Sequence, residues 1–123
     1  MYKKLENYFE HEDNRGKILG LSNSFTFEQI NIVATNANCT RGNHYHKKTK
    51  ELFIILEGEI EVSFQKVENE KLQGQKETQM FKKGDVFIVE TNVLHTFCAK
   101  TDSKWLNCLS KRSASSDFFK IDP

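Results

Sequence analysis

The segment LFIILEGEIEVSF, residues 52–64, constrains the fold of this chain more than any other stretch. Residues 52–56 form a continuous apolar run of strand length, which is typical of a β-strand covered on both faces. Glu57 and Gly58 then form a tight turn, because glycine tolerates a positive φ angle. After the turn, apolar and polar residues alternate as far as Phe64, so that one face of the strand is apolar. This pattern predicts a β-hairpin.

The remainder of the chain is also predicted to form short strands separated by turns. Further strands are expected at residues 25–34, 86–90, 93–99 and 105–109, with turns at residues 82–85 and 90–92. Residues 65–79 are polar and predict a solvated excursion at the far end of a hairpin, whereas residues 2–10 fit either a short helix or an edge strand. The serine-rich stretch at residues 111–116 is expected to be loosely held. Short strands without strong helical periodicity predict an all-β sandwich or barrel, formed by one domain over residues 1–123.

Charge, hydropathy and cysteine content exclude several classes of protein. The chain has 18 basic and 17 acidic residues, and this balance argues against a nucleic-acid binder that relies on neutralising phosphates. No run of about 18 apolar residues could form a transmembrane helix, and residues 1–14 lack the apolar stretch of a secretory signal. Cys39, Cys98 and Cys108 are odd in number and lack CxxC spacing, as expected for reduced thiols. We therefore expect a cytoplasmic protein that has a small-molecule partner and binds neither nucleic acid nor membrane.

The histidine-rich stretch RGNHYHKKTKE, residues 41–51, carries the clearest chemistry. Residues i and i+2 of a strand point to the same side, so His44 and His46 present two imidazoles together. Glu51 follows after a short turn, and His95, on a later strand, can meet them in a closed antiparallel barrel. Three imidazoles and a carboxylate suit a divalent ion such as Zn, Ni, Mn or Fe and leave positions for water or substrate. The residues alone leave open the alternative of an ordinary polar patch.

The spacing of these residues resembles the two sequence motifs of the cupin superfamily. The matching positions are His44, His46, Glu51 and Gly58 in the first motif, and Gly84 and His95 in the second. The resemblance implies a cupin double-stranded β-helix, also called a jelly-roll barrel, with His44, His46, Glu51 and His95 as metal ligands. The chain departs from the family pattern at turn-shaping positions, namely Asn38, Glu90, Asn92 and Ala99. All four ligand positions are nevertheless filled.

A closer resemblance points toward nucleotide-sugar chemistry. Residues 13–16 (DNRG), 27–33 (FEQINIV) and 40–64 are similar to the cupin domain of capsular-polysaccharide sugar epimerase/reductases. Residues 41–48 (RGNHYHKK) also resemble the nucleotide-sugar 3,4-ketoisomerases. The resemblance implies an isomerase or epimerase of surface polysaccharide biosynthesis, which removes the proton beside the ketone of a nucleotide-activated 4-keto sugar.

The same resemblance leaves two assignments open for the histidines. In the ketoisomerases the position of Glu51 usually holds glutamine, and the paired histidines act without metal. In such a metal-free site we expect His46 to be the base and His44 its partner. With a metal bound, both are ligands and the base is unassigned. Arg41 is a candidate partner for the diphosphate, because guanidinium groups bind phosphate in a bidentate manner; an ordinary exposed arginine is the alternative.

Other functions fit the same ligands. An Fe(II) cupin dioxygenase would use an identical set, and a non-catalytic sugar- or effector-binding cupin would need no chemistry at all. We also expect a homodimer formed by N-terminal or edge strands, since residues 2–9 are aromatic enough to pair.

Overall fold

The computed structural model describes residues 1–121, and nearly all regular structure in it is β-strand. The elements in chain order are β1 (Tyr2–Lys4), β2 (Phe9–Asp13), β3 (Gly16–Gly20), β4 (Gln29–Thr35), β5 (Thr40–Tyr45), β6 (Glu51–Glu57), β7 (Glu59–Glu68), β8 (Lys71–Lys82), β9 (Val86–Val89), β10 (Val93–Ala99), β11 (Ser103–Leu109), the 3-10 turn η1 (Ser115–Asp117) and β12 (Phe119–Lys120). Within residues 1–121 no helix is long and apolar enough to cross a membrane.

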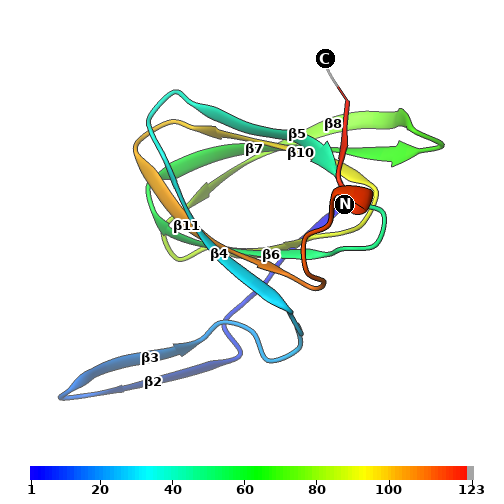
Figure 1. The fold of residues 1–123 in the computed structure, drawn as a ribbon. Helices are drawn as coiled ribbons and strands as arrows, with labels where there is room; N and C mark the ends of the chain where they lie inside the picture. The colour runs from blue at the N-terminus through cyan, green and yellow to red at the C-terminus, as the bar shows by residue number, and fades with distance from the viewer. Residues whose placement is uncertain (122–123) are drawn as a thin grey trace.

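Two five-stranded antiparallel sheets face each other (Figure 1). The first has the strand order β1-β9-β6-β11-β4 and the second β12-β5-β10-β7-β8. Several consecutive strands, such as β4 and β5 or β9 and β10, lie in opposite sheets, so the chain passes repeatedly from one sheet to the other. This is the jelly-roll arrangement. The predicted all-β fold is therefore confirmed. The predicted hairpin over residues 52–64 is wrong, because β6 and β7 lie in opposite sheets and pair with other strands; the turn at Glu57 and Gly58 instead carries the chain from one sheet to the other.

The core between the sheets is aromatic. Phe87 is fully buried and stacks on Phe81, with ring centroids 3.9 Å apart, and on Phe53 at 5.2 Å. Strand β7 alternates as predicted, because its inward-facing residues through Phe64 are buried while those between them are partly exposed. The aromatic core extends as far as His95, whose ring lies 6.2 Å from that of Phe53. A polar site thus borders the core directly.

The polar segment at residues 65–79 is more regular than expected. Its exposure is confirmed, but β7 continues to Glu68 and β8 begins at Lys71. Asn69 and Glu70 form the turn between them with positive φ angles of 52° and 63°, as a two-residue hairpin of type I′ requires. Apart from Val67, which is buried, the residues of this ribbon are exposed or partly exposed, so no hydrophobic alternation marks it in the sequence.

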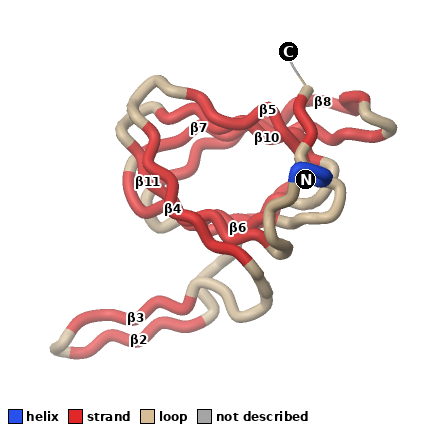
Figure 2. The backbone as a smooth tube through the Cα atoms, in the orientation of Figure 1, coloured by secondary structure: helices blue, strands red, loops and turns tan. Residues whose placement is uncertain are grey.

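The N-terminal region divides into two parts. Tyr2–Lys4 is an edge strand that pairs with β9, which decides between the two predicted possibilities in favour of a strand. Strands β2 and β3 pair with each other in a separate hairpin, which projects away from the two sheets (Figure 2). That hairpin exposes large apolar side chains, including Phe9 and Ile18.

Candidate functional site

A bulge between β5 and β10 places His44 opposite His95. The register shifts between His95 and Thr96, and Gly42 and Asn43 adopt positive φ angles of 120° and 57°. A Cβ atom on Gly42 would lie 2.5 Å from the His95 carbonyl oxygen, so only glycine fits there. The Thr96 hydroxyl donates to Asn43 Oδ1 at 2.6 Å and accepts from the Asn43 amide at 3.2 Å. The bulge therefore fixes the position of the first histidine.

The four predicted ligands converge. One ligand atom from each of His44, His46, Glu51 and His95 lies within 4.8 Å of the others. His44 and His95 come from β5 and β10 of one sheet, His46 follows β5, and Glu51 opens β6 of the opposite sheet. The site therefore lies where the two sheets meet. The expectation that Glu51 reaches the histidine side is confirmed.

Two of the histidines contact the same carboxylate oxygen. The Nε2 atoms of His46 and His95 each lie 3.0 Å from Glu51 Oε1. On the other side of each ring, His95 Nδ1 lies 3.0 Å from the Val93 carbonyl oxygen, and His46 Nδ1 contacts the Asp117 carbonyl oxygen. Because a carbonyl oxygen only accepts, both Nδ1 atoms carry hydrogen, and the Nε2 lone pairs of neutral rings face Glu51.

This arrangement needs a positive charge between the ligand atoms. Among the described residues, neither Glu51 Oε1 nor His95 Nε2 has a hydrogen-bond partner, although both atoms are buried. Two lone pairs 3.0 Å apart repel each other unless a proton or a cation lies between them. Either a protonated imidazole or a divalent ion satisfies the site. The donor set of three imidazoles and one carboxylate fits such an ion.

Burial and neighbouring charges shift the pKa values of three of these side chains. Burial, followed by the charge of His95, lowers the pKa of His44 from 6.5 to about 4. Burial would also lower the pKa of His46, but the contact with Glu51 and its charge raise it. Burial would raise the pKa of Glu51, whereas the charge of His95 and contacts with both histidines hold it well below 4.5. At neutral pH the carboxylate is therefore ionised and His44 is neutral, as metal ligation requires.

Three of the four converging residues line a cavity of about 130 Å³. The residues that line this cavity are Val33, Arg41, Gly42, His44, Glu51, Phe53, His95, Phe97, Trp105 and Asn107. Arg41 is exposed, and its guanidinium donates to Thr35 Oγ1 at 2.9 Å and to the Ala34 carbonyl at 3.0 Å. His46 instead borders a second cavity of about 360 Å³, together with Asp117 and Phe118. The two paired histidines thus face different spaces.

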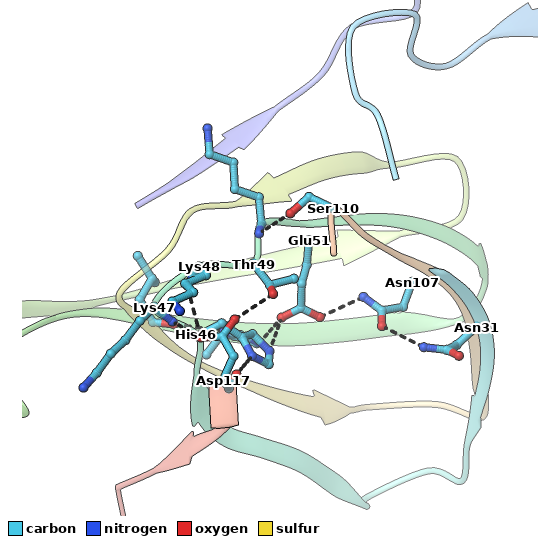
Figure 3. Close-up of polar contacts among 12 residues, drawn as sticks. Asn31, His46, Lys47, Lys48, Thr49, Glu51, Asn107, Ser110 and Asp117 are labelled. Carbon is cyan, nitrogen blue, oxygen red and sulfur yellow. Dashed lines mark hydrogen bonds and ion pairs between the residues drawn. The ribbon is translucent and has the colours of Figure 1, made fainter. Parts of the chain in front are cut away.

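The C-terminal segment is part of the site, which the sequence reasoning missed. The Asp117 carboxylate accepts the backbone amides of Lys47 and Lys48 at 2.8 and 3.1 Å and the Thr49 hydroxyl at 2.7 Å (Figure 3). Phe118 stacks on His44 with ring centroids 4.9 Å apart. The prediction that residues 111–116 are loosely held is wrong for Ser115 and Ser116, which form the 3-10 turn with Asp117. The sequence signal for this segment was the run Asp117, Phe118 and Phe119 directly after the serines.

The jelly-roll fold, with four converging side chains at the motif positions, is that of a cupin, as the sequence motifs predicted. A family model described as "Polysaccharide biosynthesis C-terminal domain" matches residues 11–104, and this chain belongs to that family. No curated protein matches the chain.

Several solved structures have a similar fold at low sequence identity. A 3,4-ketoisomerase from Helicobacter canadensis has a TM-score of 0.80 and 20% identity, covering 98% of this chain and 90% of that one. A variant 3,4-ketoisomerase from Thermoanaerobacterium thermosaccharolyticum, in complex with TDP-4-keto-6-deoxyglucose, has a TM-score of 0.78 and 14% identity, covering 98% and 87%. A dTDP-4-dehydrorhamnose 3,5-epimerase from Sulfolobus tokodaii has a TM-score of 0.79 and 16% identity, covering 98% and 82%. At these identities the likeness establishes the fold.

Proposed function

We propose that this protein is an isomerase or epimerase of a nucleotide-activated 4-keto sugar in surface polysaccharide biosynthesis. The observation that carries the proposal is the convergence of three imidazoles and an ionised carboxylate beside a cavity, which His44, His95 and Arg41 line. Membership of a polysaccharide biosynthesis family supports it. So do the names of the solved structures of the same fold, which are ketoisomerases and epimerases of such sugars.

The reaction begins by removing the proton from C3, beside the C4 ketone. The electrons of the broken C–H bond form a C3–C4 double bond, and the ketone oxygen takes the negative charge. Return of a proton to the other face of C3 gives the epimer. Protonation at C4, with loss of the proton from the C3 hydroxyl, gives the 3-keto isomer. Either outcome requires a base and a positive charge or hydrogen-bond donor near the oxygen.

In a metal-free site, the paired histidines supply the proton transfer. The sequence-based assignment makes His46 the base and His44 its partner. We propose the reverse, because His44 lines the cavity and is neutral at pH 7, whereas both ring nitrogens of His46 contact Glu51 and Asp117. A base of this kind contributes about 10²–10⁴-fold to the rate.

We further propose that a divalent ion binds His44, His46, Glu51 and His95, as the orphaned buried atoms of Glu51 and His95 suggest. Such an ion supplies positive charge for the developing enolate oxygen. The histidines are then ligands and cannot accept the proton. Arg41 is proposed to bind the diphosphate, because the two donors it uses on Thr35 and Ala34 leave further guanidinium hydrogens for phosphate.

The test is deuterium incorporation from D₂O into TDP-4-keto-6-deoxyglucose, followed by NMR. We expect exchange at C3 with the wild type and its loss in His44→Gln. The matched control is His11→Gln on the exposed β2–β3 hairpin, which should exchange normally. Absence of exchange in the wild type, with and without added Zn²⁺, Ni²⁺, Mn²⁺ or Fe²⁺, contradicts the proposal. Oxygen consumption with Fe²⁺ would then favour the dioxygenase, and sugar binding without either reaction would favour the non-catalytic cupin.

We also propose that the protein is a cytoplasmic homodimer. Exposed apolar side chains support the dimer: Ile30 and Ile32 on the edge strand β4 are 53% and 64% exposed, and Ile18 on the projecting hairpin is 59% exposed. Edge strands with exposed apolar residues are normally covered. Light scattering should give the dimer mass, and a monomer at micromolar concentration contradicts this. Thiol titration of freshly isolated protein should find Cys39 and Cys98 reduced, as cytoplasmic residence requires.

A further inference from the structure

A row of amide side chains crosses the inner side of one sheet and ends at Glu51. Gln29 and Asn31 lie two residues apart on β4 and therefore point to the same face. Asn107 lies opposite Asn31 on β11, and Glu51 lies on β6, the next strand. Figure 3 shows the part of this row from Asn31 to the carboxylate. The row begins at the backbone amide of Ser113, on the segment that leads to η1.

Every hydrogen bond along this row points the same way. The Ser113 amide donates to Gln29 Oε1 at 2.8 Å. Gln29 Nε2 then donates to Asn31 Oδ1 at 3.3 Å, and Asn31 Nδ2 to Asn107 Oδ1 at 3.4 Å. Finally, Asn107 Nδ2 donates to Glu51 Oε2 at 2.8 Å. The last bond is short and buried, as expected for a donor on a charged acceptor.

The direction of the row is fixed at both ends by groups that cannot reverse. A backbone amide can only donate, and an ionised carboxylate can only accept. Reversing the amide of Asn107 would bring its oxygen to 2.8 Å from the Glu51 oxygen, where two acceptors repel. The row therefore requires an acceptor at Glu51 Oε2, and leaves Oε1 as the oxygen that faces the histidines.

We propose that Asn107 is a positioning residue that, supported by Asn31 and Gln29, aims Glu51 Oε1 at His46 and His95. A buried carboxylate without this donor would leave Oε2 unpaired, which is unfavourable and favours rotation of the side chain. Rotation would move Oε1 out of its contacts with both imidazoles. The inference concerns the site of the proposed isomerase but does not depend on the identity of its substrate.

The first experiment measures the affinity for Co²⁺, whose visible absorption reports the number and geometry of the ligands. Asn107→Leu keeps a side chain of similar size without a donor, and we expect its Kd to rise about 10–100-fold, with altered absorption bands. Asn31→Leu acts only through Asn107, so its effect should be smaller. Asn36→Ala, on an exposed loop, is the matched control and should bind as the wild type. Wild-type affinity in Asn107→Leu, with a folded protein by circular dichroism, overturns the proposal.

The second experiment needs no metal. The side-chain NH₂ signals of Asn107, Asn31 and Gln29 are followed by NMR in the apo protein, with and without Glu51→Gln. We expect the Asn107 signal to shift most, then Asn31, then Gln29, because each amide polarises the next. An unchanged Asn107 signal overturns the proposal even if Co²⁺ does not bind. Neither experiment uses a sugar, so failure of the isomerase proposal leaves both results intact.

Discussion

Lowering the pH should reduce the free energy of unfolding, because His44 takes up a proton more readily in the unfolded chain. Its pKa is about 4 in the folded protein because of burial and the charge of His95, against 6.5 as the ordinary value. The unfolded chain therefore binds this proton more readily than the folded one, and stability is lost as pH falls from 6.5 toward 4. Each pH unit inside this window changes the free energy of unfolding by up to about 1.4 kcal/mol. Between pH 7 and pH 4.5 the loss from His44 alone amounts to about 2 kcal/mol.

The assay is urea unfolding at a series of pH values in the presence of EDTA, for the wild type and His44→Gln. We expect the two curves of stability against pH to diverge, with the variant losing about 2 kcal/mol less between pH 7 and pH 4.5. The pKa values of Glu51 and Asp117 are lowered, so the stability that these carboxylates contribute is lost at lower pH, and this loss occurs in both curves. His46 has a raised pKa, so its contribution is present below pH 6.5 and fades as pH rises through the folded value. Curves that stay parallel within about 0.5 kcal/mol refute the reasoning.

Three further perturbations have definite outcomes. Asp117→Ala removes the acceptor of two backbone amides and one hydroxyl, and should cost about 2 kcal/mol in urea unfolding; a cost near zero means that the C-terminal segment is not anchored through this carboxylate. Phe87→Ala leaves a cavity among stacked rings and should cost about 3–5 kcal/mol, whereas Phe87→Leu should cost less. Gly42→Ala should weaken Co²⁺ binding, since its Cβ would collide with the His95 carbonyl; Gly74→Ala shares the positive φ but has no atom within 4 Å, so equal effects of the two would contradict the role of the bulge.

The convergence of the four side chains could be predicted because three of them are local. His44, His46 and Glu51 lie within eight residues of one another, and strand periodicity alone puts the two imidazoles together. The buried strands could also be predicted, because a covered face leaves a hydrophobic pattern. Strand β8 left none over residues 71–80, since both of its faces are exposed there.

The parts of the site that escaped prediction depend on pairing between distant segments. Asn107 meets Asn31 only through the register of β11 with β4, which no local pattern encodes. Asp117 reaches the loop after His46 across about 70 residues of sequence, and is an ordinary acidic residue when read alone. The projecting β2–β3 hairpin was missed because β2 (FEHED) is mostly charged and exposed, so that no hydrophobic alternation marks it as a strand.

The strand order also bears on how the protein folds during its synthesis. Strand β11 lies between β6 and β4 in the finished sheet but is made long after both. Until it leaves the ribosome, β4 and β6 have no partner on their facing edges, and their apolar residues remain available to other chains. Among residues 1–121, only the β2–β3 and β7–β8 hairpins pair consecutive strands, so only these two can form early from neighbouring residues. We expect nascent chains halted before residue 103 to be cleaved readily by protease, and to bind chaperones until β11 joins the sheet.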